Sequence, residues 1–416
     1  MRGRKVPSAA CRGGDSVTAS SMGGDDDTPE RKRATMQKKY LMTPGPTPVP
    51  AEVLLTQAAP IIHHRTPDFS AAFKQAIEGL KYVFQTEGDV LLFACSGTGV
   101  MEAAIANSFC AGDSVIVCRN GKFGDRQKSI AEVYGLNVID LQYEWTSVVD
   151  PADVATALKE NPGVRGVIVT QSETSSGVLN DVKAIGAIVK EYPDTILIVD
   201  SITGIGAVDC NTDEWGLDIV MTGSQKGLML PPGLAACTVS AKAWKAYERS
   251  TLPKFYFDFK RYQSNIAKDT TPFTPAVSLV LGLNVALNMI REEGIENTIA
   301  RHSRLAEATR LGCEALGLKL FAPAEGRGSA VTPVWVPEGV DGKKIVSILK
   351  NKYGITIAGG QDDYAGRIFR VGHLGYFGEF DIITTLAGLE MTLAELGYEF
   401  ERGAGIKAAE AVFMGE

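Results

Sequence analysis

One lysine with small neighbours is the residue best suited to chemistry in this sequence. Lys226 lies in the stretch TGSQKG, residues 222–227, directly after the apolar run DIVMTG. Small neighbours leave its amine without steric cover, so that the strand end can present it to a cleft. Most lysines in such loops are only solvated, and a reactive role for Lys226 therefore depends on what else lies near it.

Two further features could accompany this lysine in one site. Asp200 ends the apolar run TILIVD, where a buried carboxylate is costly unless it is paired. A protonated ring nitrogen would pair with it, although a helix cap or loop anchor is the alternative. The run VLLFAC leads into SGTGVMEAA, and Ser96, Gly97 and Thr98 lie at an expected strand-to-helix junction that favours a phosphate. The junction has neither the GxGxxG nor the GxxxxGK[ST] spacing, so dinucleotide and NTP binding lack their fingerprint.

The elements that must position these residues alternate along the chain. Very apolar strands are buried on both faces, which predicts an α/β fold with a largely parallel sheet covered by helices. In such a sheet, ligands bind beyond the carboxyl ends of the strands, where the polar residues above are found. The expected strands are 90–95, 113–118, 137–142, 164–171, 195–200, 218–223 and 236–240, with helices near 68–86, 99 onward, 122–135, 151–160 and 181–191.

The chain is long enough for two packed domains behind a polar tail. The first segment is rich in Gly, Ser, Asp and Arg, which predicts disorder, or a true start at Met36. The small domain is expected to contain strands at 319–323, 331–337, 355–360 and 367–373. The predicted parts are a disordered tail (1–35), an arm packing with the small domain (36–50), a large domain (51–274), an interdomain helix (275–293) and a small C-terminal α/β domain (294–416).

Composition excludes several classes of protein. The net charge is −7 and no basic stripe is interleaved with aromatics, so no nucleic-acid partner is expected. No apolar run approaches the ~20 residues that span a bilayer, so no membrane contact is expected. Seven scattered cysteines without a Cys-x-x-Cys pair, and only four histidines, argue against a disulfide framework and against a metal site. These features predict a cytoplasmic enzyme.

From about Met36 to Leu396, the chain resembles class V pyridoxal-5′-phosphate (PLP) aminotransferases, in the branch of alanine/serine–glyoxylate and serine–pyruvate enzymes. The resemblance implies PLP fold type I: a large domain with a mainly parallel seven-stranded sheet sandwiched by helices, and a smaller C-terminal α/β domain. It also implies a homodimer with the active site at the interface. The matching blocks are TPGPTPVP, HRTPDF, SGTGVMEAA, NGKFGDR, TQSETSSG, VDSITGIGA, TGSQKGLMLPPG, TPFTPAVS and GRIFRVGHLG.

Carried over position by position, the resemblance assigns a catalytic pair and a set of ligand contacts. Lys226 would carry PLP as a Schiff base, and Asp200 would pair with the pyridine nitrogen. The other implied roles are phosphate binding by Ser96, Gly97, Thr98 and Gln225, ring stacking by Phe123, a contact near the ring oxygen by Thr174, the neighbouring subunit's phosphate site for Thr271 and Thr274, substrate carboxylate binding by Arg370, and a place in the substrate-pocket loop for Gly45.

The implied reaction moves an amino group from a small amino acid, alanine or serine, to a small 2-keto acid, glyoxylate or pyruvate. A single arginine matched to carboxylate binding favours such donors over aspartate or glutamate. Four specificities stay open: alanine–glyoxylate, serine–glyoxylate, serine–pyruvate and ureidoglycine–glyoxylate. The donor pockets for a methyl and a hydroxymethyl group differ by only about 1–3 kcal/mol.

Three other functions compete with this one. Cysteine desulfurase-like lyases resemble the chain in fold, but they place histidines where Gln225 and Phe123 stand and a cysteine on a later loop, whereas no cysteine follows Cys313. Some relatives are labelled soluble hydrogenase subunits, yet the cysteine spacing offers no clustered ligands for such a metal centre. A non-catalytic partner protein is disfavoured because Lys226, Asp200 and Arg370 are all present.

Overall fold

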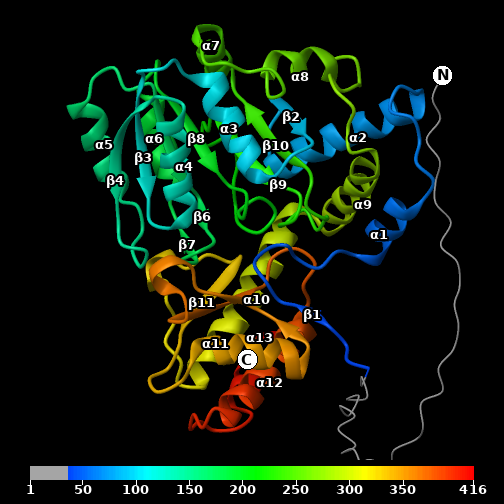
Figure 1. The fold of residues 1–416 in the computed structure, drawn as a ribbon, viewed down its shortest axis with the longest axis vertical. Helices are drawn as coiled ribbons and strands as arrows, with labels where there is room; N and C mark the ends of the chain where they lie inside the picture. The colour runs from blue at the N-terminus through cyan, green and yellow to red at the C-terminus, as the bar shows by residue number, and fades with distance from the viewer. Residues whose placement is uncertain (1–35) are drawn as a thin grey trace, which may run out of the picture. The chain divides into compact units, whose positions relative to one another are not determined.

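The computed structural model describes residues 36–416, and residues 38–416 form one compact unit (Figure 1). The predicted disordered tail, 1–35, lies outside the described residues. The main sheet has seven strands in the order β2-β10-β9-β8-β5-β3-β4. β10 is antiparallel to both of its neighbours, and the remaining pairs are parallel. The strands are β2 (Asp89–Phe93), β3 (Ser114–Arg119), β4 (Asn137–Gln142), β5 (Gly166–Thr170), β8 (Ile196–Asp200), β9 (Ile219–Gly223) and β10 (Ala235–Val239).

Alternate residues of each central strand face two separate hydrophobic cores. In β8, Leu197 and Val199 belong to one core, whereas Ile196 and Ile198 belong to the other. This follows from the two-residue period of a strand, and it explains why β5, β8, β9 and β10 are buried throughout. The predicted mainly parallel, seven-stranded α/β fold is therefore confirmed.

Helices cover both faces of this sheet (Figure 1). One core is completed by side chains of α2, α5, α6 and α9, and the other by α3, α4, α7 and α8. The helices are α1 (Ala51–Ala58), α2 (Pro67–Phe84), α3 (Gly97–Ser108), α4 (Lys122–Val133), α5 (Pro151–Glu160), α6 (Val182–Lys190), α7 (Ala241–Arg249), α8 (Phe259–Ile266) and α9 (Val277–Glu293), and β6 (Ser172–Glu173) with β7 (Val178–Leu179) forms a two-stranded ribbon.

A third core lies in the C-terminal part of the chain, where a three-stranded sheet of order β11-β14-β13 packs on helices. Met42 joins this core, and β1 pairs with β12, so the N-terminal arm contacts this part of the fold. The predicted domain boundaries stay a prediction. The elements are β1 (Tyr40–Leu41), α10 (Ile295–Ala315), η1 (Ala324–Gly326), β11 (Val331–Trp335), α11 (Gly342–Ile348), η2 (Leu349–Tyr353), β12 (Ile355–Thr356), β13 (Ala358–Gly359), η3 (Asp362–Tyr364), β14 (Ile368–Gly372), α12 (Glu379–Glu395) and α13 (Ala404–Met414).

The strand predicted at 319–323 is wrong. The segment makes only an isolated bridge, between Leu320 and Val334. Pro323 has no N–H to continue a ladder, and the 3-10 helix η1 begins directly after it. Within residues 36–416, no helix is both long and apolar enough to cross a membrane.

A buried histidine supports the loop that packs behind the reactive lysine. His302 Nδ1 lies 2.6 Å from the carbonyl oxygen of Thr298, and its Nε2 accepts the N–H of Gly375 at 2.8 Å. A Cβ on Gly375 would lie 3.0 Å from the carbonyl oxygen of Lys226, so this loop touches the lysine's backbone. The two ring contacts require the neutral imidazole with its proton on Nδ1.

The neutral state of His302 predicts destabilisation in acid. Burial, with help from the charge of Arg301, lowers the pKa of His302 to about 4. The unfolded chain binds this proton near pH 6.5, so stability falls as the pH drops from there towards 4. The contribution of His302 to the free energy of unfolding between these pH values is on the order of 3 kcal/mol. In urea unfolding, the free energy of unfolding should change less between pH 7 and pH 4.5 for His302→Gln than for the wild type. An equal change in both proteins would contradict the contribution assigned to neutral His302.

Candidate active site

One cavity of about 360 Å³ lies beyond the carboxyl ends of β2, β3, β5, β8 and β9. Its volume is within the range of about 300–1,000 Å³ found for small-molecule sites. Because β10 alone is reversed among the seven strands of this sheet, the ends of the other strands meet at the same edge. Nine of the residues selected from the sequence line this cavity: Gly45, Ser96, Gly97, Thr98, Phe123, Thr174, Asp200, Gln225 and Lys226.

Lys226 projects from the turn after β9 and is held by the N-terminal arm. Its side chain is 7% exposed, and Nζ donates a hydrogen bond of 2.6 Å to the carbonyl oxygen of Pro44. Burial, followed by the charge of Arg370, lowers the pKa of Lys226 to about 8. A larger fraction of this amine is therefore neutral near pH 7 than for an ordinary lysine, and the neutral amine is the reactive form.

Gly45 leaves the space that this amine occupies. Its φ is +143°, and a Cβ at this position would lie 2.4 Å from Lys226 Nζ. Any other residue would push the amine out of its place against Pro44. Gly45 borders both the cavity and Lys226. This position is consistent with the place in the substrate-pocket loop that the resemblance implies for it.

Asp200 ends β8 and presents a carboxylate to the cavity. The residue is 2% exposed, and Oδ1 accepts the N–H of Ile202 at 3.0 Å. Burial raises the pKa of Asp200 to about 7, because this single backbone hydrogen bond does not offset the lost hydration. A cationic group placed beside the carboxylate would lower that pKa and hold it ionised.

The turn at 96–98 offers free backbone donors to the same cavity. Ser96 makes no side-chain cap at the N-terminus of α3, and the first N–H groups of a helix have no partner within it. Gln225 lines the cavity too, and its Oε1 is buried without a hydrogen-bond partner among residues 36–416. Thr170 Oγ1, which also borders the cavity, is in the same condition. The N–H groups of the turn and the hydroxyl of Thr170 can donate hydrogen bonds to an anionic ligand, whereas Gln225 Oε1 can only accept one.

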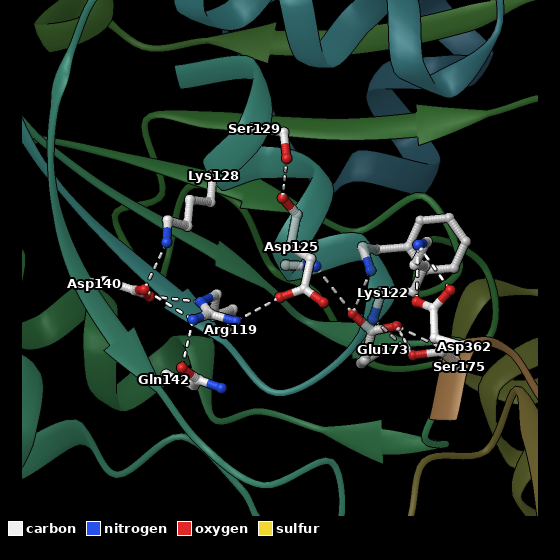
Figure 2. Close-up of polar contacts among 12 residues, drawn as sticks. Arg119, Lys122, Asp125, Lys128, Ser129, Asp140, Gln142, Glu173, Ser175 and Asp362 are labelled. Carbon is white, nitrogen blue, oxygen red and sulfur yellow. Dashed lines mark hydrogen bonds and ion pairs between the residues drawn. The ribbon is translucent and has the colours of Figure 1, made fainter. Parts of the chain in front are cut away.

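The carboxylate of Glu173, from the strand β6, lies beside Ser175 (Figure 2) and binds the backbone of Phe123 at the start of α4. Glu173, which is 0% exposed, accepts the N–H groups of Phe123 and Gly124 at 3.0 and 3.1 Å. Its other oxygen accepts the N–H of Ser175 at 3.0 Å and the hydroxyl of Ser175 at 2.6 Å. Glu173 thus serves as the N-terminal cap of α4, and it holds the backbone of Phe123 in place.

Arg370 lies on the strand β14 and is not among the residues that line this cavity, but it contacts Thr174, which is. It is 6% exposed, and its Nε and Nη1 donate 2.9 Å hydrogen bonds to the carbonyl oxygens of Gly359 and Thr174. Burial lowers the pKa of Arg370 to about 10, which leaves it charged at neutral pH. Thr174, whose carbonyl aims this guanidinium, places its own hydroxyl in the cavity 2.6 Å from that of Thr203.

Two functional candidates in this region did not emerge from the sequence. Arg126 borders the cavity, and its guanidinium carbon lies 4.8 Å from the centre of the Phe123 ring. The three-residue spacing within NGKFGDR could have revealed it, because such residues share one face of a helix. Glu173, which lies next to Thr174 within TQSETSSG, gave no comparable signal, since burial of one acid is not visible in a sequence.

Thr271 and Thr274 are not brought to this cavity within the chain. They border a small space of about 20 Å³ near Phe73 and Phe93. Thr271 donates to the carbonyl oxygen of Phe273 at 2.7 Å. Their role towards a neighbouring subunit stays a prediction. Within residues 36–416, no three His, Cys, Asp or Glu side chains are grouped so that they could hold a metal ion.

The lining residues fit a PLP molecule. An amine, a buried carboxylate, an aromatic face and a turn with free N–H groups border one cavity, and these are the groups that an aldehyde, a pyridinium nitrogen, a flat ring and a phosphate require. The unpartnered atoms of Gln225 and Thr170 add places for hydrogen bonds. The residues that would hold the group are thus present on this chain.

Comparison with known proteins identifies the family. Residues 39–365 match the family described as "Aminotransferase class-V". The "Soluble hydrogenase, small subunit" of Synechococcus sp. (strain PCC 6716) is 48% identical, over 90% of this chain and 98% of its own length. The "L-aspartate–glyoxylate aminotransferase" of Paracoccus denitrificans (strain Pd 1222) is 39% identical, over 89% and 95%. The crystal structure of a ureidoglycine–glyoxylate aminotransferase from Bacillus subtilis superposes with a TM-score of 0.87 at 30% identity, covering 92% of this chain and all of that one. The chain belongs to the class-V aminotransferases.

Proposed function

We propose that this protein is a PLP-dependent transaminase that moves an amino group from a small amino acid, alanine or serine, to glyoxylate or pyruvate. The family implies PLP. The observation that carries the proposal is the meeting of Lys226, Asp200 and the 96–98 turn around one cavity. A single flat, phosphorylated ring can reach all three only because they line the same space.

The bound cofactor supplies an electron-withdrawing ring that stabilises negative charge at the substrate's α-carbon. Lys226 provides the amine that moves a proton from and to that carbon, and its lowered pKa suits this exchange near neutral pH. Asp200 maintains a positive charge on the ring nitrogen, since an ionised carboxylate beside it favours the protonated form. Arg370 holds the substrate carboxylate and thereby fixes the α-carbon relative to Lys226.

Glyoxylate as acceptor has support from the names of two relatives, the Paracoccus denitrificans and Bacillus subtilis enzymes. The donor is less constrained, because the Paracoccus relative is named for L-aspartate. The name "Soluble hydrogenase, small subunit" belongs to the Synechococcus relative, whereas the cavity described above supports amino transfer.

The proposal is tested by supplying purified protein and PLP with each donor and each acceptor in turn. The donors are alanine, serine, ureidoglycine and aspartate, and the acceptors are glyoxylate and pyruvate. We expect turnover with alanine or serine and glyoxylate, measured as the keto acid that the donor becomes. Turnover with aspartate as the sole active donor would contradict the proposal that the donor is alanine or serine. No turnover with any pair would contradict the proposed reaction.

We further propose that the chain works as a homodimer in which Thr271 and Thr274 complete the phosphate site of the neighbouring subunit. The support for a second copy is the family match of the segment around Thr271 and Thr274, because neither residue lines the cavity of its own chain. Light scattering should give the mass of two chains. A fully active monomer would contradict the arrangement.

A further inference from the structure

The cavity contains an arginine for which the reaction above has no use. Arg126 lies on α4, one helical turn beyond Phe123, and both side chains border the cavity. No ion pair links Arg126 to an acidic side chain in the part of the chain that the structure describes. Arg126 is half-buried, and a guanidinium without a carboxylate partner is available to bind an anion.

The contacts of Arg126 indicate which anion that is. Its Nη1 donates a hydrogen bond of 3.2 Å to Thr98 Oγ1, a neutral hydroxyl at the first turn of α3. The guanidinium carbon of Arg126 lies over the ring of Phe123, 4.8 Å from the ring centre. The arginine is therefore directed towards the end of the cavity where the free N–H groups of Gly97 and Thr98 lie. Three kinds of donor meet there: backbone N–H groups, a hydroxyl and a guanidinium fork.

We infer that Arg126 is a phosphate-binding residue, which makes this site prefer a phosphorylated cofactor over the same ring without phosphate. The inference rests on the proposed function, because it assumes that the ligand is PLP. A fork of N–H donors can give two hydrogen bonds to a phosphate, whereas Thr98 and the α3 N-terminus donate to it from another side. Gln127, the next residue on α4, is buried and is not among the residues that border this cavity.

The test is equilibrium binding of PLP and of pyridoxal to the full-length protein freed of cofactor, followed by protein fluorescence. In Arg126→Gln, PLP affinity should fall about 10- to 100-fold, the effect of losing one or two charge-assisted hydrogen bonds. Pyridoxal affinity should stay unchanged, because pyridoxal has no phosphate. Arg126→Lys keeps the charge without the fork, and it should lie between the wild type and Arg126→Gln.

A matched control uses another cation of the same helix. Lys128 also lies on α4, but it pairs with Asp140 at 2.9 Å and does not border the cavity. Lys128→Gln makes the same change in net charge, and it should leave the affinities for both ligands as in the wild type. If PLP affinity fell as much in this control as in Arg126→Gln, the loss would come from the change in net charge alone. That result would overturn the inference.

Two other outcomes would also overturn it. An equal loss of PLP and pyridoxal affinity in Arg126→Gln would mean that Arg126 only supports Phe123. Unchanged PLP affinity with a raised KM for aspartate would assign the guanidinium to the second carboxylate of a substrate. Failure of the proposed reaction is a separate result, because a protein that turns over no donor still reports the two binding constants.

Discussion

Lys226→Ala should abolish amino transfer and remove the visible absorbance of covalently held PLP, while the protein still binds PLP non-covalently. The rate should fall by about 10³-fold or more, since the variant loses both the nucleophile and the group that moves the proton. Folding should survive the change. The buried amine of the wild type has an unfavourable environment, as its pKa of about 8 records, and alanine removes that cost.

The absorbance spectrum and the rate are measured on the same sample, next to a lysine that cannot reach the cavity. Lys242 lies on α7, and its Nζ is 3.4 Å from Asp218 Oδ2. Lys242→Ala should keep the absorbance and the rate. Retention of the absorbance in Lys226→Ala would show that another amine carries the cofactor, and the assignment of Lys226 would be wrong.

The residues at the carboxyl ends of the strands were predictable from sequence. Asp200 is the last residue of an otherwise apolar strand. Lys226 and the turn from Ser96 to Thr98 each come shortly after an apolar run. A parallel sheet places such ends at one edge, so three short stretches far apart in the chain could be assigned to one site. In the structure, all three stretches border one cavity.

Supporting residues could not be predicted, because their roles depend on contacts between segments. Glu173 caps a helix that begins about 50 positions earlier, and nothing in its own neighbourhood indicates that partner. Arg126 gains its role from Thr98, which lies on a different helix. The short helices α1 and α8, with eight residues each, were missed for a similar reason. Short helices depend on tertiary packing more than on their own sequence.

Arg370→Ala should raise the KM for the amino acid donor roughly 100-fold and change PLP affinity little. A forked hydrogen bond to a carboxylate contributes about 3 kcal/mol, which is close to that factor. The structure suits Arg370 to this task, because Nε and Nη1 are anchored by the carbonyl oxygens of Gly359 and Thr174. These two hydrogen bonds fix the orientation of the guanidinium plane. The buried carboxylate of Glu173 helps to keep the group charged.

The measurement combines initial rates over a range of donor concentrations with a PLP titration of the same variant. Arg370→Lys keeps the charge but not the fork, and it should recover only part of the donor's KM. Arg367, three positions earlier, stacks on Trp335 at 5.6 Å and provides the matched control. Arg367→Ala should leave both constants unchanged. An equal loss of PLP and donor affinity in Arg370→Ala would mean that the arginine supports the fold of the site, because a carboxylate-binding residue acts on the substrate alone.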